Sequence, residues 1–142
     1  MEYPALFERA QEGGFVITFP GFDWGVTQGD TEEEAREMAA DAIHTMIREH
    51  IRNGEPVPRA SKPRGRKYRM IRLSALDAAK IALYEAFRRS GLRKVDLARR
   101  LGIPKTTVDR LFDLDNHTRL DQIEAAFGIL GKELTIDVRN AV

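Results

Sequence analysis

The part of the chain best suited to binding chemistry is residues 94–111, which read KVDLARRLGIPKTTVDRL. Apolar residues recur there where two short helices that cross at a steep angle need contacts. Gly102 lies where the turn between the helices requires a positive backbone angle, and Pro104 suits the first turn of the second helix because an amide there would have no partner. This spacing predicts a helix-turn-helix, whose second helix enters the major groove of DNA.

The second helix of this motif presents polar groups that can meet phosphates and base edges, namely Lys105, Thr106, Thr107, Asp109 and Arg110. Arg110 is the predicted base reader, whereas Lys105 and Thr106 are predicted to read bases or to hold phosphate. Arg99 and Arg100, on the first helix, are predicted to lie along the DNA backbone. The alternative is a plain helical hairpin whose glycine and leucines only build a core.

The distribution of charge favours DNA binding by the second half of the chain. The 142 residues have a net charge of +1. Residues 1–58 carry 12 Asp/Glu against 4 Lys/Arg, a net charge of −8, and residues 59–142 carry 19 Lys/Arg against 10 Asp/Glu, a net charge of +9. Two small domains with different partners are therefore expected. The basic half, with a helix before the motif and another from Thr118 after it, favours a DNA-binding domain over the hairpin alternative.

Composition excludes several classes of protein. The absence of cysteine excludes disulfides, thiolate catalysis and cysteine-based zinc or iron–sulfur sites. No apolar run approaches the roughly 20 residues that span a bilayer, which rules out a membrane protein. The first ten residues lack the basic start and apolar core of a secretory signal, so a cytoplasmic protein is expected.

The first thirty residues are predicted to form a small antiparallel sheet. Two runs place apolar residues at every second position, with a glycine pair at 13–14 between them to turn the chain. The first run is Tyr3, Ala5 and Phe7, and the second is Phe15, Ile17 and Phe19. A third short strand is predicted through residues 24–27. One face of such a sheet must be covered by another element.

A long helix is predicted to supply that cover. Thr31 and Glu34 have the spacing of a capping box, so the helix is expected to begin at about Glu32. Its apolar positions repeat at three-and-four spacing as far as Ile51, and Gly54 is suited to end it.

The remaining segments complete the predicted architecture. The run RASKPRGRKYR at 59–69 has six basic residues in eleven and is either a linker or an arm along DNA phosphates. Residues 68–73 are predicted to form a strand that pairs back onto the first sheet, and residues 133–138 a strand with no partner in their own half. The predicted fold is α+β, with a sheet-and-helix domain at 1–58, a basic linker and possible fourth strand at 59–73, and an all-α helix-turn-helix domain with a C-terminal strand at 74–142.

Two known families resemble the two halves. The string FVITFPGFDWGVTQGDTEEEAREMAADAI, closed by NGEPVPRAS, resembles the N-terminal domain of HicB antitoxins, and residues 75–138 resemble the Cro and phage-repressor helix-turn-helix domains. The first resemblance implies a reduced ribonuclease H-like fold that binds and masks a small basic ribonuclease toxin, HicA. The second implies that the chain represses its own operon as a homodimer or homotetramer on double-stranded operator DNA.

The acidic half suits such a partner, because an acidic surface speeds association with a basic protein. The candidate toxin contacts are Phe19, Phe22, Asp23 and Trp24. Trp24 with Phe22 beside it is a candidate anchor, since aromatic residues dominate interface energetics, and core packing is the alternative for one of the two. This turn departs from the family, because Pro20 is followed directly by Gly21 where many members carry an aspartate.

Two other functions are open on the sequence alone. A stand-alone DNA-binding regulator would use the first domain to oligomerise or to sense a small ligand. A divalent-metal nuclease would need carboxylates near strand ends, for which Asp23, Asp30 and Glu34 are the candidates. Capping and turn formation already explain Asp30 and Glu34, and His44, His50 and His117 lack metal-ligand spacing, so neither catalysis, a cofactor nor a metal is expected.

Overall fold

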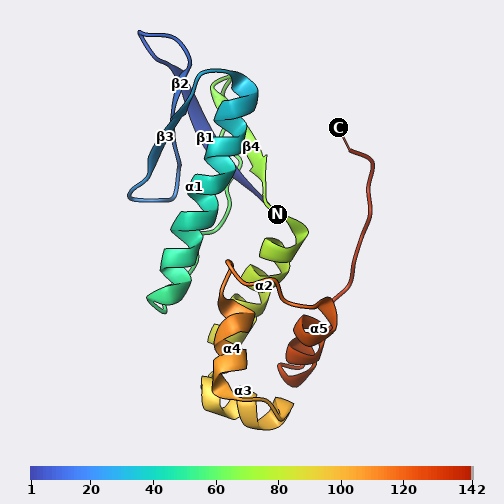
Figure 1. The fold of residues 1–142 in the computed structure, drawn as a ribbon. Helices are drawn as coiled ribbons and strands as arrows, with labels where there is room; N and C mark the ends of the chain where they lie inside the picture. Colours follow the sequence, from blue (N-terminus) through green and yellow to red (C-terminus); the bar gives the residue numbers. More distant parts are fainter. Residues whose placement is uncertain (142) are drawn as a thin grey trace. The chain divides into compact units, whose positions relative to one another are not determined.

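A computed structural model describes residues 1–141, which fold into four strands and five helices (Figure 1). In chain order these are β1 (Glu2–Arg9), β2 (Phe15–Thr18), β3 (Val26–Gly29), α1 (Glu32–Arg52), β4 (Tyr68–Arg72), α2 (Ala75–Ser90), α3 (Lys94–Leu101), α4 (Lys105–Phe112) and α5 (Leu120–Ile129). The chain divides into two compact units, unit 1 (Met1–Ala78) and unit 2 from Ala79 onward, so the division falls inside α2. The sequence placed the start of the second domain at residue 74, and the end of that predicted domain, Val142, lies outside the described residues.

Unit 1 is a four-stranded antiparallel sheet in the order β3-β2-β1-β4, with α1 packed on one face (Figure 1). Because side chains alternate along a strand, one set from each strand faces the helix and is buried. This set comprises Tyr3, Ala5, Phe7, Ile17 and Ile71. The predicted α+β sheet is confirmed, and β4 pairs with β1 along residues 2–6 as the predicted fourth strand.

The third strand begins later than the sequence predicted. Trp24 and Gly25 lie in the loop, and β3 starts at Val26. The reason is local, because Gly25 has a φ of +108°, which a strand residue does not adopt. A Cβ at Gly25 would also lie 2.4 Å from the sulfur of Met46, so a larger residue would require the Met46 side chain to shift.

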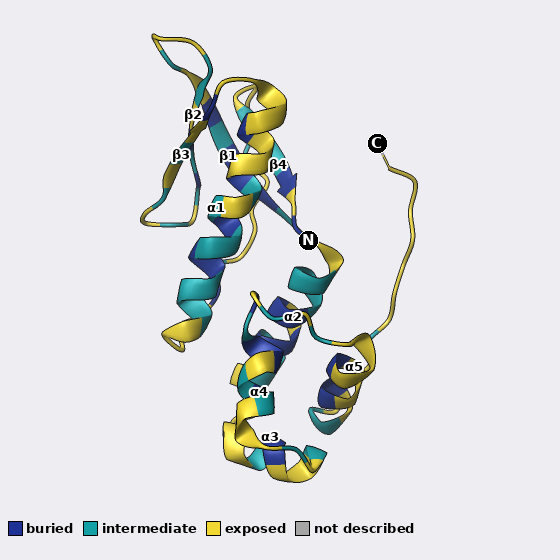
Figure 2. Ribbon diagram, in the orientation of Figure 1, coloured by how far each residue is buried: buried dark blue, intermediate teal, exposed yellow. Residues whose placement is uncertain are grey.

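Helix α1 follows the predicted pattern. The Thr31 hydroxyl accepts a hydrogen bond from the Glu34 amide at 3.1 Å, which satisfies one of the unpaired donors at the helix start. The side of the helix that faces the sheet is buried from its first turn to Ile47 (Figure 2), through Ala35, Ala39, Ile43, Met46 and Ile47.

Unit 2 packs the end of α2 with α3, α4 and α5. Its core includes Leu97, Val108, Leu111 and Ile123, all buried. The last helix was predicted to begin at Thr118 but begins at Leu120, because the Thr118 hydroxyl accepts a hydrogen bond from the Asn116 side chain instead of capping the helix.

The predicted C-terminal strand at 133–138 is wrong for the single chain. These residues form no strand within the described part of the chain and run as an extended segment after α5 (Figure 1). A strand requires a hydrogen-bonded neighbour, and no sheet edge pairs with this segment. Its apolar side chains are therefore exposed, Ile136 by 70% and Val138 by 89%. No helix within residues 1–141 is long and apolar enough to cross a membrane.

Candidate functional sites

The first candidate site is the pair of helices α3 and α4. Helix α3 ends at Gly102, whose φ of +69° turns the chain sharply, and the Ile103 amide then donates to the Ala98 carbonyl at 3.0 Å. Helix α4 begins after Pro104. Leu97 and Val108 are buried between the helices, so the exposed side of α4 has a defined orientation relative to α3.

The predicted DNA-contact residues lie on these two helices. Lys105, Thr106, Arg110, Arg99 and Arg100 are exposed, whereas Thr107 and Asp109 are half-buried. Arg100 and Arg110 form no ion pair with a carboxylate among residues 1–141, so both guanidinium groups can bind an external anion.

Carboxylates hold several of the other cations in place. Asp109 lies 2.9 Å from the ammonium of Lys94 and 3.9 Å from that of Lys105. Asp96 accepts from the Arg93 backbone amide at 3.0 Å and from the Arg99 guanidinium at 3.2 Å. The hydrogen bonds from Arg93 lower the pKa of Asp96 below its ordinary value of 3.8. Asp96 thus stays ionised and fixes the start of α3.

Lys80 was missed by the sequence analysis. It is 0% exposed, and its ammonium donates to the carbonyls of Arg110 (3.0 Å), Asp113 (2.7 Å) and Asn116 (2.5 Å). These carbonyls lie at and just beyond the end of α4, where the regular helix hydrogen bonds end, and those of Arg110 and Asp113 also accept from the amides of Asp113 and Asn116. Its signal in the sequence was a single lysine inside the apolar run AAKIAL.

The second candidate site is a groove of about 400 Å³ at the β2–β3 loop. It is lined by Leu6, Thr18, Phe19, Pro20, Phe22, Asp23, Trp24, Gly25 and Val26. Among the predicted toxin contacts, Asp23 is exposed and Trp24 is 50% exposed. Val26, which the sequence analysis did not single out, is 70% exposed.

The two phenylalanines among the predicted toxin contacts serve the core. Phe19 is buried, so we do not propose it as a contact. Phe22 is half-buried and packs against the rings of Tyr3 and His50, with centroid distances of 5.7 and 5.9 Å. Of the two adjacent aromatic side chains, Phe22 is thus the one that packs inward, and Trp24 is the one that solvent reaches.

The groove adjoins the face of the sheet opposite α1. The strand register places Val26 opposite Thr18, Thr18 opposite Leu6 and Leu6 opposite Tyr68, so these side chains form one row across that face. Val16 is exposed on the same face. Trp24 and this row form one continuous candidate surface, which we call the outer face.

The histidines and the magnesium candidates are dispersed. His44 lies 2.7 Å from Asp77, and His50 lies 3.2 Å from Glu55. Within the described residues no three His, Asp or Glu side chains are grouped so as to hold a metal ion. Of the magnesium candidates, Glu34 lies in the capped first turn of α1.

Comparison with known proteins defines the class to which this chain belongs. Residues 2–82 match the model of the HicB-like antitoxins of bacterial toxin–antitoxin systems. The chain therefore belongs to the HicB-like antitoxin family. Antitoxins are not enzymes, which agrees with the prediction that this chain is not one.

Individual relatives extend the similarity over nearly the whole chain. "Antitoxin HicB 1" of Photorhabdus laumondii subsp. laumondii is 37% identical, covering 97% of this chain and 87% of the relative. "Antitoxin HicB" of Escherichia coli (strain K12) is 36% identical, covering 96% of this chain and 98% of the relative. A solved "Toxin-Antitoxin complex from Streptococcus pneumoniae" is 16% identical, with a TM-score of 0.45 over 80% of this chain and 97% of that one.

Proposed function

We propose that this antitoxin acts in the cytoplasm on two partners. Unit 1 binds and masks a HicA-like ribonuclease toxin, and unit 2 binds double-stranded operator DNA and represses the operon. The observation that carries the proposal is the exposed apolar surface at Trp24 and Val26, which lies within an acidic segment of net charge −8.

The outer face has the composition of a protein-binding surface. A half-exposed tryptophan beside a largely exposed valine exposes apolar area to water, and burying such groups in a partner is favourable. Asp23, exposed at the rim of the groove, adds negative charge that a basic toxin would meet. Phe22 supports this loop from beneath. A meander, one long helix and a fourth strand on β1 also support a reduced ribonuclease H-like fold for unit 1.

Co-expression with the small protein encoded beside this one tests toxin binding. We expect a stable complex to co-purify through a tag on this chain, and growth to stop when this chain is omitted. Trp24→Ala is expected to weaken the complex at least tenfold, since an interface hot spot contributes about 2 kcal/mol or more. Val95→Ala, in an exposed apolar position of unit 2, is the matched control and is expected to bind normally. Absence of toxicity and of any complex would refute the proposed partner.

We propose that α3 and α4 form a helix-turn-helix, with α4 in the major groove. Arg110 reads a base, Lys105 and Thr106 contact bases or phosphate, and Arg99 and Arg100 lie along the backbone. The steep turn at Gly102 supports this assignment, as do the guanidinium groups of Arg100 and Arg110, which form no ion pair within residues 1–141.

A two-fold operator would require a dimer, and we propose that residues 133–138 supply its contact. Pairing of this segment with its copy would satisfy both backbones and would bury Ile136 and Val138. Two α4 helices could then lie about 34 Å apart, one turn of DNA. Ile136→Asp is expected to shift the chain toward monomer in sedimentation and to weaken operator binding. An unchanged dimer would show that the dimer contact lies outside residues 133–138. A second contact, through unit 1, would join two dimers into a tetramer.

A further inference from the structure

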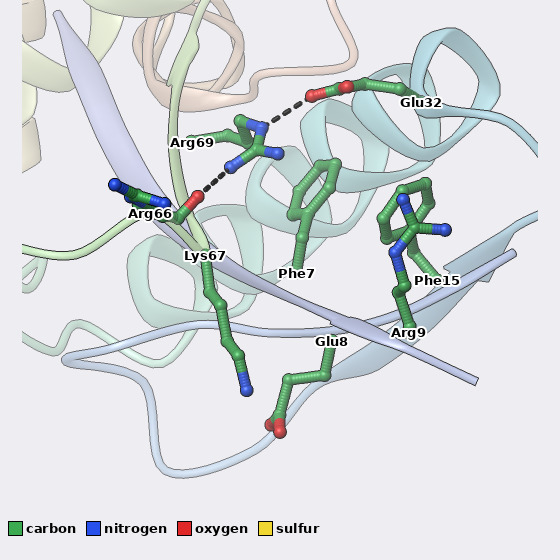
Figure 3. A pocket seen from close by; sticks show the side chains of 8 residues that line it. All are labelled: Phe7, Glu8, Arg9, Phe15, Glu32, Arg66, Lys67 and Arg69. Carbon is green, nitrogen blue, oxygen red and sulfur yellow. Dashed lines mark hydrogen bonds and ion pairs between the residues drawn. The ribbon is translucent and has the colours of Figure 1, made fainter. Parts of the chain in front are cut away.

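Unit 1 contains a second hollow, of about 460 Å³, at the opposite end of β2 from the groove. Figure 3 shows the side chains that line it. It is lined by Phe7, Glu8, Arg9, Phe15, Glu32, Arg66, Lys67 and Arg69. Four cations and two carboxylates give this lining a net charge of +2. This positive charge is opposite in sign to the net charge of residues 1–58, which supply the other side chains of the lining. The difference arises because three of the four cations come from residues 66–69.

Arg69 and Glu32 form the fixed wall of this basic pocket. The Arg69 Nε donates to Glu32 at 2.5 Å, a second nitrogen donates to the Arg66 carbonyl at 2.5 Å, and the guanidinium lies 5.5 Å from the centre of the Phe7 ring (Figure 3). The hydrogen bond from Arg69 lowers the pKa of Glu32. These two charges neutralise each other, so the excess positive charge comes from the remaining cations.

Arg9, Arg66 and Lys67 are those remaining cations. Arg66 and Lys67 are exposed, and the Arg9 guanidinium lies over the Phe15 ring at 5.5 Å. Stacking on an aromatic face leaves the N–H groups at the edge of a guanidinium available to an anion. None of the three forms an ion pair with a carboxylate within residues 1–141.

We propose that this basic pocket binds the phosphate groups of a nucleic-acid strand, separately from α3 and α4. Guanidinium groups hold phosphate oxygens by paired hydrogen bonds, and the volume of the hollow lies within the range of ligand-binding pockets. The segment just before the pocket-lining residues 66–69 carries three further cations, Arg59, Lys62 and Arg64. A row of cations that ends in a pocket suits a ligand whose negative charges repeat, more than it suits a single small anion.

The test uses the full chain with Arg110→Ala, which weakens the separate DNA site proposed on α4. Backbone amide shifts are followed on addition of oligo(dT), oligo(rU), a scrambled duplex or polyglutamate. We expect the three nucleic acids, but not polyglutamate, to shift the amides of Arg9, Phe15 and Lys67. A larger effect with either single strand identifies that strand as the ligand, and a larger effect with the duplex identifies DNA backbone.

Salt dependence supplies a quantitative criterion. Lys67→Gln is expected to lower the slope of log K against log salt by about 0.7 on a single strand or about 0.9 on a duplex, because one phosphate contact is lost. Arg52→Gln removes an exposed charge from the end of α1 and is the matched control. The proposal is overturned if polyglutamate shifts the same amides equally, if Arg52→Gln changes the slope as much, or if shifts are confined to α3 and α4. The last outcome would leave the function proposed for unit 2 intact.

Discussion

Lys80 shows how one buried side chain can set the position of a functional helix. Its ammonium donates to three carbonyls at and just beyond the end of α4, and Lys80 itself has no exposure to water. A buried charge is tolerated only where it is hydrogen-bonded, and here the three partners are backbone carbonyls of the last turn of α4 and of the segment that follows it. The side chain and the carbonyl of Arg110 therefore have different roles, since the exposed side chain can contact DNA while the carbonyl anchors the helix through Lys80.

Lys80→Met is expected to destabilise unit 2. The substitution keeps most of the side-chain volume but removes the ammonium donor from three carbonyls, of which those of Arg110 and Asp113 keep a backbone amide donor. The expected cost is about 1–3 kcal/mol. Denaturant unfolding measures this loss. Lys132→Met, an exposed lysine of the same unit, is the control and is expected to change stability little. Equal effects of the two substitutions would contradict the role given to Lys80.

Arg110→Ala is expected to relax the base preference of operator binding and to cost about 1–3 kcal/mol. Arg99→Ala, at a predicted phosphate contact, is expected to weaken binding to all sequences nearly equally. Operator and scrambled duplexes compared at one salt concentration distinguish these outcomes. Unchanged operator affinity in Arg110→Ala would rule out α4 as the reading helix.

The lowered pKa of Asp96 predicts that α3 loses stability in acid. Its pKa is lowered in the folded chain, so its contribution is present above the ordinary value of 3.8 and is lost as the pH falls through the lower, folded value. Asp96→Asn is expected to lower the melting temperature at neutral pH and to flatten its decline with acid below pH 3.8. Parallel acid curves for the two proteins would show that the ion pairs of Asp96 contribute no stability.

At the scale of elements, the turn between α3 and α4 determines how the candidate DNA surface is presented. The turn has three residues, and Gly102 allows the reversal because glycine adopts a positive φ without a steric penalty. A Cβ at Gly102 would meet no atom within 4 Å, so conformation rather than crowding is the constraint there. At Gly25 both constraints act, because its φ is positive and a Cβ there would contact the Met46 sulfur.

Gly102→Ala is expected to destabilise unit 2 by about 1–2 kcal/mol, the cost of the left-handed conformation for a residue with a Cβ. Gly128→Ala is the matched control, because Gly128 lies inside α5, has open space around its Cα and has no positive φ. Alanine there is expected to stabilise the helix by about 0.5–1 kcal/mol. Thermal or denaturant unfolding measures both changes, and the expected signs are opposite. Stabilisation by Gly102→Ala would refute the strain assigned to this turn.

At the scale of the molecule, charge and fold divide the chain at different places. The change from acidic to basic sequence occurs near residue 59, whereas the first compact unit continues to Ala78. The difference arises from β4, whose residues pair with β1 and bury Ile71 and Leu73. The basic residues just before β4 thereby become part of the unit that the acidic sequence builds, and the basic pocket is a consequence.

A fragment of residues 1–58 is therefore expected not to fold alone. A fragment of residues 1–78, which includes β4, is expected to fold. Without β4, strand β1 has an unpaired edge and the helix-facing core loses two apolar side chains. Dispersion of amide proton resonances compares the two fragments. Native-like dispersion in the shorter fragment would show that the sheet needs only three strands.

Local patterns in the sequence determined much of this fold. Alternation predicted the first two strands and the fourth, capping and apolar spacing predicted α1, and glycine and proline placed the turn between α3 and α4. These signals act over a few residues, so neighbouring residues suffice to specify them. The opposite charges of the two halves are likewise a property of the sequence alone.

Only the tertiary structure decided which of the predicted contact residues are exposed and which are buried. Phe19 and Trp24 are both aromatic and near in sequence, yet only packing against the sheet and α1 buries one and exposes the other. Lys80 acquires its role from carbonyls 30 and more positions away, and residues 133–138 form no strand because no strand of the sheet pairs with them in the single chain. Burial and strand pairing depend on groups far apart in the chain, which is why local patterns could not specify them.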